Sequence, residues 1–363
     1  MVNKIAVIIA NWNGRKFLTD CLSSISNQTY GNYRTIFVDN GSEDDSVLFV
    51  RNNFSKIEII ALKKNTGFAV ANNVGIRRAF EDAEVNYIVP LNNDTRTDEN
   101  FLAELVETHL EYSRTPGERV GAIAPKILKL HGAGKIDSTG ILVYKDGNAI
   151  DRGADENDCG KYNDSVEVFG PCACACLYSR EALENVGFEK LQNIDTDPKN
   201  TQYFDEDYFS YHEDVDLAWR LRLRSWKTIY EPKAVVWHIG SGTGVSSSPF
   251  KAFYLHRNQY FNLIKNFPFP FLLRGLLSLP RMYWQLTMSA SNGSGASAKL
   301  KDKSGWLGMA KIVFASWYDV LINLPSLWNK RRLIQRNRTI NCNEFDELLM
   351  RFQADINKIV LGS

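Results

Sequence analysis

The fold is most constrained by an alternation of short apolar segments with segments of helical periodicity near the start of the chain. Between the apolar segments, hydrophobic residues recur at the spacing of a buried helix face. Strands that alternate with helices in this way are typical of a doubly wound, mostly parallel α/β sheet with helices on both faces. The predicted strands are residues 4–10, 34–38, 57–62 and 87–91.

Asn and Asp side chains come directly after three of these predicted strands: Asn11 and Asn13, Asp39, and Asn92, Asn93 and Asp94. The remaining strand leads into an Asn- and Gly-rich turn with Gly67, Asn72 and Asn73. The carboxyl ends of parallel strands share one edge of a sheet, where ligands bind. A carboxylate flanked by amides can hold a divalent cation that keeps sites for phosphate. The pattern indicates a nucleotide-type site, although Asn and Asp also favour ordinary turns.

Two common phosphate-binding motifs do not occur in the chain. No Gly-x-Gly-x-x-Gly follows the first strand, and there is no Gly-x-x-x-x-Gly-Lys-Ser/Thr. This disfavours a dinucleotide fold and a P-loop, so a metal and scattered side chains would have to neutralise phosphate. The net charge of +1 gives no indication of nucleic-acid binding.

A second informative stretch runs over residues 208–223 and carries Glu213, Asp214 and Asp216 at the start of a predicted helix. A carboxylate held there suits general-base catalysis, and the alternative is a helix cap with solvated charges. Further on, His238 directly follows a predicted strand. It is either a metal ligand, since imidazole binds borderline divalent ions, or a hydrogen-bonded core residue.

The composition changes after residue 245, so we expect a catalytic domain over residues 1–245 and a helical region over residues 246–363. Residues 267–279 are apolar and aromatic with nearby Arg274 and Arg281, which fits either a membrane interface or packing on the main domain. Prolines and charges argue against a spanning helix, and no uncharged run is long enough to cross a bilayer. We expect a loop at residues 289–305 and a closing amphipathic helix at residues 345–360.

Three of the six cysteines, Cys172, Cys174 and Cys176, alternate along a predicted strand over residues 170–178. Alternate strand residues point to one face, which is poor geometry for a disulfide framework. We interpret these cysteines as small core residues of a protein in a reducing compartment, the cytoplasm.

Taken together, these stretches resemble the inverting family 2 glycosyltransferases, which have the GT-A fold, and in particular the rhamnosyltransferase-like members that build bacterial cell-surface polysaccharides. The resemblance covers about the first two-thirds of the chain. It implies a nucleotide-sugar donor (a UDP-sugar or dTDP-rhamnose), a divalent metal (Mn²⁺ or Mg²⁺), and a hydroxyl of a glycan or lipid-linked glycan as acceptor. The matching pieces are residues 7–14, 38–42, 65–75, 91–95, 211–220 and 237–238.

The resemblance also implies roles for individual residues. Asn92-Asn93-Asp94 stands where the family has Asp-x-Asp, so Asp94 would bind the metal and Asn92 would lie near the ribose or a metal-bound water. Asp214 would be the catalytic base, and His238 would reach the metal. The donor pocket would be formed by Asp39, Asn11, Asn13, Gly67, Asn72, Asn73 and Asn93.

Two other functions stay open at this point. A sugar nucleotidyltransferase also uses an α/β sheet with a metal, but it would usually show a Gly-rich basic loop after the first strand, of which residues 11–15 are a poor version. A catalytically inert nucleotide-sugar-binding protein could keep the fold without turnover. The second is disfavoured because Asp39, Asp94, Asp214 and His238 are all present.

Overall fold

The computed structural model describes residues 3–191, 201–240, 248–293 and 295–354. The chain divides into two compact units. The N-terminal unit comprises Met1–Ile141 and Asp151–Thr243, and the C-terminal unit comprises Leu142–Ile150 and Gly244–Ser363. The C-terminal helical region therefore also includes a short segment from the middle of the sequence.

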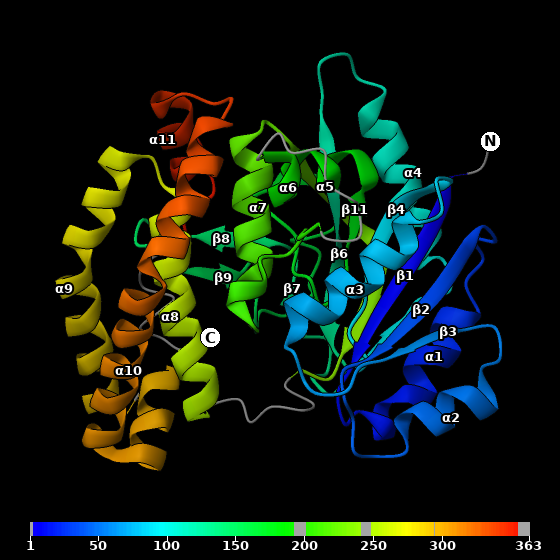
Figure 1. Ribbon diagram of the computed structural model, residues 1–363, viewed down its shortest axis with the longest axis horizontal. Helices are drawn as coiled ribbons and strands as arrows, with labels where there is room; N and C mark the ends of the chain where they lie inside the picture. The colour runs from blue at the N-terminus through cyan, green and yellow to red at the C-terminus, as the bar shows by residue number, and fades with distance from the viewer. Residues whose placement is uncertain (1–2, 192–200, 241–247, 294, 355–363) are drawn as a thin grey trace. The chain divides into compact units, whose positions relative to one another are not determined.

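The N-terminal unit is built on one mixed sheet, which has ten strands within the described residues (Figure 1). Its main path runs β10-β12-β6-β11-β4-β1-β2-β3, with β5 on β12 and β7 on β6. β4, β1, β2 and β3 are mutually parallel, as the sequence predicted. β11 is antiparallel to β4 and β6 on either side of it. The strands are β1 Lys4–Asn11, β2 Tyr33–Asp39, β3 Glu58–Ala61, β4 Val85–Pro90, β5 Thr95–Thr97, β6 Val120–Lys129, β7 Ile136–Ser138, β10 Val166–Val168, β11 Leu177–Ser179 and β12 Lys227–His238.

Helices cover both faces of this sheet because alternate strand residues are apolar on both sides. Ile5, Val7 and Ile9 of β1 pack in a core with α1 (Leu18–Ser26) and α4 (Phe101–Ser113). Ala6 and Ile8 face the other core, built with α3 (Phe68–Phe80), α5 (Arg180–Val186) and α7 (Glu213–Leu223). β1 is thus buried on both faces, as expected of a central parallel strand. Shorter helices complete the unit: η1 Arg15–Phe17, α2 Ser46–Asn53, α6 Phe188–Leu191 and η3 Glu206–Tyr208.

The predicted strand over residues 170–178 is wrong for most of its length, since only Leu177–Ser179 form β11. The backbone before β11 makes hydrogen bonds to a loop and to a side chain instead of pairing with a neighbouring strand. The backbone amide of Asn92 donates to the Cys174 carbonyl, and the Ala173 amide donates to the Asp214 carboxylate. Consequently the cysteines do not share a face, because Cys174 and Cys176 lie in opposite cores. All six cysteines are free thiols.

The C-terminal unit consists of four helices in its described residues, together with Leu142–Ile150, which includes most of β8 (Ile141–Val143) and β9 (Ala149–Asp151) and the turn between them. Val143 pairs with Phe352 and Ala354, so this segment is held by the backbone that follows the last helix. Arg331 is buried and donates to the carbonyls of Ile264 and Phe267, at the end of the first helix. The helices are α8 Pro249–Asn266, α9 Phe269–Ser291, α10 Gly295–Arg336 and α11 Cys342–Arg351.

Two predictions for this unit need correction. The expected loop at residues 289–305 is wrong, because α9 continues to Ser291, α10 begins at Gly295, and the Lys301 ammonium donates to the Ala290 carbonyl. Inside α10, Gly305 has non-helical backbone angles, where the helix is kinked. The closing helix begins earlier than expected, capped by Asn341, and it ends at Arg351; residues 355–360 lie outside the described residues.

One helix in the described part of the chain, α10, is long and apolar enough to cross a membrane by length and composition. Only 11% of its apolar window is buried within the protein.

Candidate functional site

The ends of β1, β2 and β4 are tied together by a network of amide and carboxylate groups. Asn11 and Asp39 are paired across β1 and β2, and the Asn11 amide donates to Asp39 at 3.0 Å and to Ser42 at 3.1 Å. The Asn93 amide donates to the Asn11 side-chain oxygen at 2.7 Å. Gly14 leaves room for this contact, since a Cβ there would overlap both side chains. The predicted convergence of polar strand ends is therefore present in the structure.

These bonds also show what the predicted donor residues contact. Asp39 accepts from the Ser42 amide at 3.0 Å and from its hydroxyl at 2.6 Å. Asn13 has a φ of 49° and accepts from the Glu43 amide at 2.8 Å. Asp39 and Asn13 thus shape the turns at the strand ends, and their predicted contacts with the donor remain predictions.

Asn40, to which the sequence assigned no role, fixes the turn before α3. Its side chain donates to Asn65 and to the Gly67 carbonyl, both at 3.1 Å, and accepts from the Thr66 amide and hydroxyl. Gly67 has a φ of +88°, and a Cβ there would overlap the Phe209 carbonyl. Glycine is therefore required both for the backbone angle and for the close approach of residue 209.

The two asparagines of α3 are buried and bonded to protein groups. Asn72 donates to the Phe68 carbonyl at 3.0 Å. Asn73 donates to the Phe204 carbonyl at 2.8 Å and to Glu206 at 3.0 Å, and its oxygen accepts from the amides of Tyr203 and Phe204. These bonds make Asn73 an anchor for the segment before α7. Its predicted place in the donor pocket stays a prediction.

Asp94 and His238 meet at the same edge of the sheet. The His238 Nε2 lies 3.2 Å from a carboxylate oxygen of Asp94, while its Nδ1 lies 2.7 Å from Asp137 on β7. Burial lowers the pKa of His238, but the neighbouring Cys174, Asp137 and Asp94 outweigh this and raise it well above the usual value. With an acceptor at each nitrogen, the doubly protonated ring is the form that fits this arrangement.

This donor set suits a divalent cation that completes its shell with other ligands. Asp94 offers a hard oxygen and His238 a neutral nitrogen once the proton at Nε2 is displaced. No group of three or more His, Cys, Asp or Glu side chains arranged to hold a metal occurs within the described ranges. A cation here would therefore take its remaining ligands from phosphate oxygens and water, as Mg²⁺ commonly does. The Asn92 amide donates to the Cys174 carbonyl, and its own carbonyl accepts from the Thr95 hydroxyl, so it is anchored beside Asp94.

Asp137 is a site residue that the sequence did not point to, because only the pairing of β7 with β6 brings it to His238. A carboxylate on the second ring nitrogen orients a histidine ligand. We expect Asp137→Ala to weaken Mn²⁺ binding by about 10- to 100-fold, measured by calorimetric titration in the presence of UDP. Asp164→Asn, at an exposed position of the same unit, is the matched control. Equal Mn²⁺ affinities for Asp137→Ala and wild type would contradict this role.

Asp214 stands at the first turn of α7, half-buried. Its carboxylate accepts from the amides of Ala173 at 3.1 Å and Val215 at 2.8 Å. Burial raises its pKa, and burial together with the charge of Asp214 raises the pKa of the adjacent Glu213 well above its usual value. A carboxylate with a raised pKa at a helix start is suited to accept a proton near neutral pH.

The approach to α7, residues 209–212, is conformationally unusual. Phe209, Tyr211 and His212 have φ values of 63°, 68° and 65°. Such angles are uncommon for residues other than glycine, and they cluster at functional sites. These angles could not be predicted from the residue types, but they mark the segment that presents Asp214.

Asp151 on β9 is a further acidic residue beside the site. Burial raises its pKa to about 7, and the charges of Asp137 and Asp214 act in the same direction. Because this pKa is above the unfolded value, the contribution of Asp151 to stability is present at low pH and is lost as the pH rises through about 7. Asp151→Asn cannot ionise, so it should raise the Tm by a few degrees over wild type near about pH 8 and by clearly less near about pH 5, since the loss in wild type begins at the unfolded pKa and is complete only above the folded one.

This difference is measured by thermal denaturation of metal-free protein across that pH range. The control is again Asp164→Asn, for which we expect no pH-dependent difference. A Tm gap between Asp151→Asn and wild type that does not grow with pH would argue against the raised pKa.

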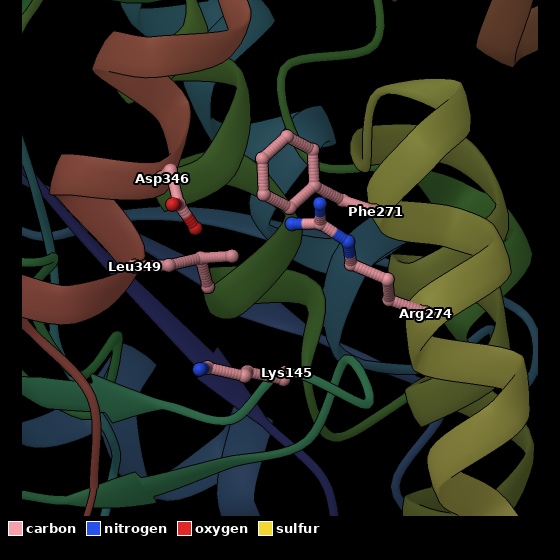
Figure 2. A pocket seen from close by; sticks show the side chains of 5 residues that line it. All are labelled: Lys145, Phe271, Arg274, Asp346 and Leu349. Carbon is pink, nitrogen blue, oxygen red and sulfur yellow. The ribbon is translucent and has the colours of Figure 1, made fainter.

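A small cavity in the C-terminal unit does not suit a nucleotide-sugar. It is lined by Lys145, Phe271, Arg274, Asp346 and Leu349, and its volume is about 50 Å³ (Figure 2). Ligand sites of this class usually measure several hundred Å³. This cavity is therefore not a candidate for the donor site.

Comparisons with known proteins show which family and which fold this chain resembles. Residues 6–123 match the family model described as "Glycosyl transferase family 2". A poly-beta-1,6-N-acetyl-D-glucosamine synthase of Staphylococcus epidermidis is 26% identical over 242 residues, covering 65% of this chain and 50% of that protein. A teichoic acid poly(glycerol phosphate) polymerase of the same species is 31% identical over 97 residues, covering 26% of this chain and 13% of that protein. The chain thus spans about half the length of the synthase, and less of the polymerase.

Among solved structures, Staphylococcus aureus TarS aligns with 96% of this chain and 55% of its own, at 16% identity and a TM-score of 0.52. At that identity the likeness concerns the fold alone, and it agrees with the α/β sheet and C-terminal helices described above. None of the relatives named here is a rhamnosyltransferase, so that subgroup stays a prediction. The chain carries a glycosyl transferase family 2 domain with a GT-A-type fold, as the resemblance in its sequence implied.

Proposed function

We propose that this protein transfers a sugar from a nucleotide-diphosphate donor to a hydroxyl group of a glycan or lipid-linked glycan, by a single displacement with inversion. The proposal rests on the position of Asp94 and His238, whose side chains face each other at 3.2 Å at the carboxyl ends of β4 and β12. The relatives named for poly-N-acetylglucosamine and teichoic acid synthesis support a role in making cell-surface polymers. UDP-sugars and dTDP-rhamnose are the candidate donors.

Asp214 is the proton acceptor in this proposal. It takes the proton of the acceptor hydroxyl as that oxygen attacks the anomeric carbon from the face opposite the leaving diphosphate. Asp94 and His238 would hold a divalent cation, Mn²⁺ or Mg²⁺, which when bound offsets the charge that develops on the diphosphate. Asp137 keeps the His238 ring oriented, and Asn11, Asn93 and Asp39 keep the strand ends in place.

We further propose that the reaction takes place in the cytoplasm, at the inner face of the membrane when the acceptor is lipid-linked. The six free thiols fit a reducing compartment. Transfer assays with defined donors and acceptors would identify the acceptor, the linkage and the transferred sugar.

The test is a thermal-shift screen of nucleotide sugars, beginning with UDP-N-acetylglucosamine and dTDP-rhamnose, each with and without Mn²⁺ or Mg²⁺. A ligand that binds only the folded state raises the Tm by mass action. We expect a metal-dependent shift with one donor and release of its nucleoside diphosphate when acceptor is added. A shift without transfer to any acceptor would favour an inert binding protein. Pyrophosphate release from a nucleoside triphosphate and a sugar phosphate would favour a nucleotidyltransferase.

A further inference from the structure

The C-terminal unit exposes large apolar side chains along two of its helices. On α10 the side chains of Leu307, Phe314, Tyr318, Leu321 and Trp328 are between 38% and 71% exposed. Their spacing of seven, four, three and seven positions places them on one face of the helix. The opposite face is buried through Ser316, Val320, Leu327, Arg331 and Ile334. The exposed stripe is therefore a property of a folded, packed helix.

α9 carries a second stripe of the same kind. Phe269, Leu273, Leu277, Trp284 and Met288 follow one another at four- and seven-residue intervals and are between 42% and 81% exposed. α9 and α10 pack on each other through other residues, since the Trp317 indole donates to the Tyr283 hydroxyl at 2.9 Å. Monomeric soluble proteins rarely expose apolar surface on this scale, and such surface marks an interaction site.

The charge of these two helices identifies what the surface meets. α9 and α10 contain ten lysines and arginines and only two aspartates, Asp302 and Asp319. Asp319 is paired with Arg257 at 3.0 Å. Without the buried Arg331, the excess is seven positive charges, in contrast to a net charge of +1 for the whole chain. A second copy of so basic a face would be repelled, whereas an anionic surface attracts each Lys or Arg that approaches it.

The same helices are poorly suited to cross the bilayer. Lys311 is exposed within the apolar stripe of α10, and Asp319 lies in the same segment. Gly305 interrupts the helix, and Pro280 and Arg281 interrupt the apolar sequence of α9. A helix that is apolar on one stripe and basic at its margins lies in the plane of the interface. Exposed Trp and Tyr side chains are typical of that depth.

We propose that the exposed stripes of α9 and α10 form an interfacial face that inserts into the headgroup region of an anionic lipid bilayer. The helices lie in the plane of the membrane and do not span it. The proposal is independent of the transferase activity, because binding needs neither donor nor acceptor.

The experiment measures sedimentation of the full chain with vesicles. Wild type should sediment with vesicles containing phosphatidylglycerol at low salt, and much less with phosphatidylcholine alone or at high salt. The variant Leu277→Glu/Leu321→Glu should lower the partition coefficient by about tenfold or more, because two carboxylates would enter an anionic, apolar layer. Leu48→Glu, at a position 57% exposed on α2, is the matched control and should bind as wild type does. The Tm of each variant checks that it is folded.

A second measurement distinguishes lying in the interface from spanning. The exposed Trp284 and Trp328 should give a blue shift in fluorescence with anionic vesicles, and alkaline carbonate should release the protein. Failure to sediment, unchanged binding by the double variant, or release only by detergent would each overturn the proposal. So would a wild-type dimer that Leu277→Glu/Leu321→Glu converts to monomer without any lipid binding.

Discussion

Replacing Asp214 with asparagine is expected to lower the kcat of sugar transfer by about 10²- to 10⁴-fold while leaving the affinity for the donor unchanged. The amide has nearly the same shape and can still accept from the Ala173 amide, so the turn before α7 should be retained. It cannot, however, accept the proton of the acceptor hydroxyl. Two titrations measure this: initial rates as a function of acceptor concentration, and donor binding by calorimetry.

The pH dependence gives an independent check on the same residue. Because burial raises the pKa of Asp214, wild-type kcat/KM should fall as the pH is lowered through that raised value. Asp214→Asn should lack this acidic limb. Asp20→Asn, at an exposed position on α1, is the matched control and should keep both rate and pH profile. Turnover near the wild-type level in Asp214→Asn would remove Asp214 from the role of base.

Replacing Asp94 with alanine is expected to weaken Mn²⁺ binding by more than about 100-fold, since loss of an orienting neighbour alone commonly costs 10- to 100-fold. Asp94 supplies the carboxylate facing His238 Nε2, and its removal leaves the imidazole as the lone protein donor of the pair. The measurement is a Mn²⁺ titration in the presence of UDP, followed by electron paramagnetic resonance of the free ion. His238→Ala should behave similarly.

The control for the Mn²⁺ titration is Asp164→Asn, which should titrate as wild type does. If Asp94→Ala and wild type gave the same Mn²⁺ titration curve, the metal assignment would be wrong. Sugar transfer could then still be assayed without added metal. The Tm of Asp94→Ala in the absence of Mn²⁺ separates a loss of metal affinity from a loss of stability.

The N-terminal parallel strands could be predicted because each is a short apolar run that ends in polar residues. β1 and β2 follow this pattern, and their register then brings Asn11 opposite Asp39. The antiparallel insertion of β11 between β4 and β6 could not be predicted, because strand order depends on long-range pairing. The apolar pattern of residues 170–176 is typical of a strand, but their backbone bonds to a loop and to Asp214.

The candidate site could be predicted only where its residues stand in recognisable sequence patterns. Asp94, Asp214 and His238 were found because they follow strands or begin a helix. Asp137 and Asp151 were missed because long-range pairing alone brings them to His238 and Asp214. The helix at residues 295–304 was missed for a related reason: its Ser- and Lys-rich sequence is a weak local signal, and packing on α9 outweighs it.

The turn before α3 and the turn before α7 are joined through their backbones. The Phe68 amide donates to the Phe209 carbonyl at 2.6 Å, and Gly67 lies directly against the same carbonyl. The turn that precedes α3 and the strained turn that presents Asp214 are therefore joined by a backbone hydrogen bond and a close backbone contact. A ligand that moves one turn must therefore move the other turn with it or break this hydrogen bond. By thermodynamic linkage, if donor binding changes the affinity for acceptor by some factor, acceptor binding changes the affinity for donor by the same factor.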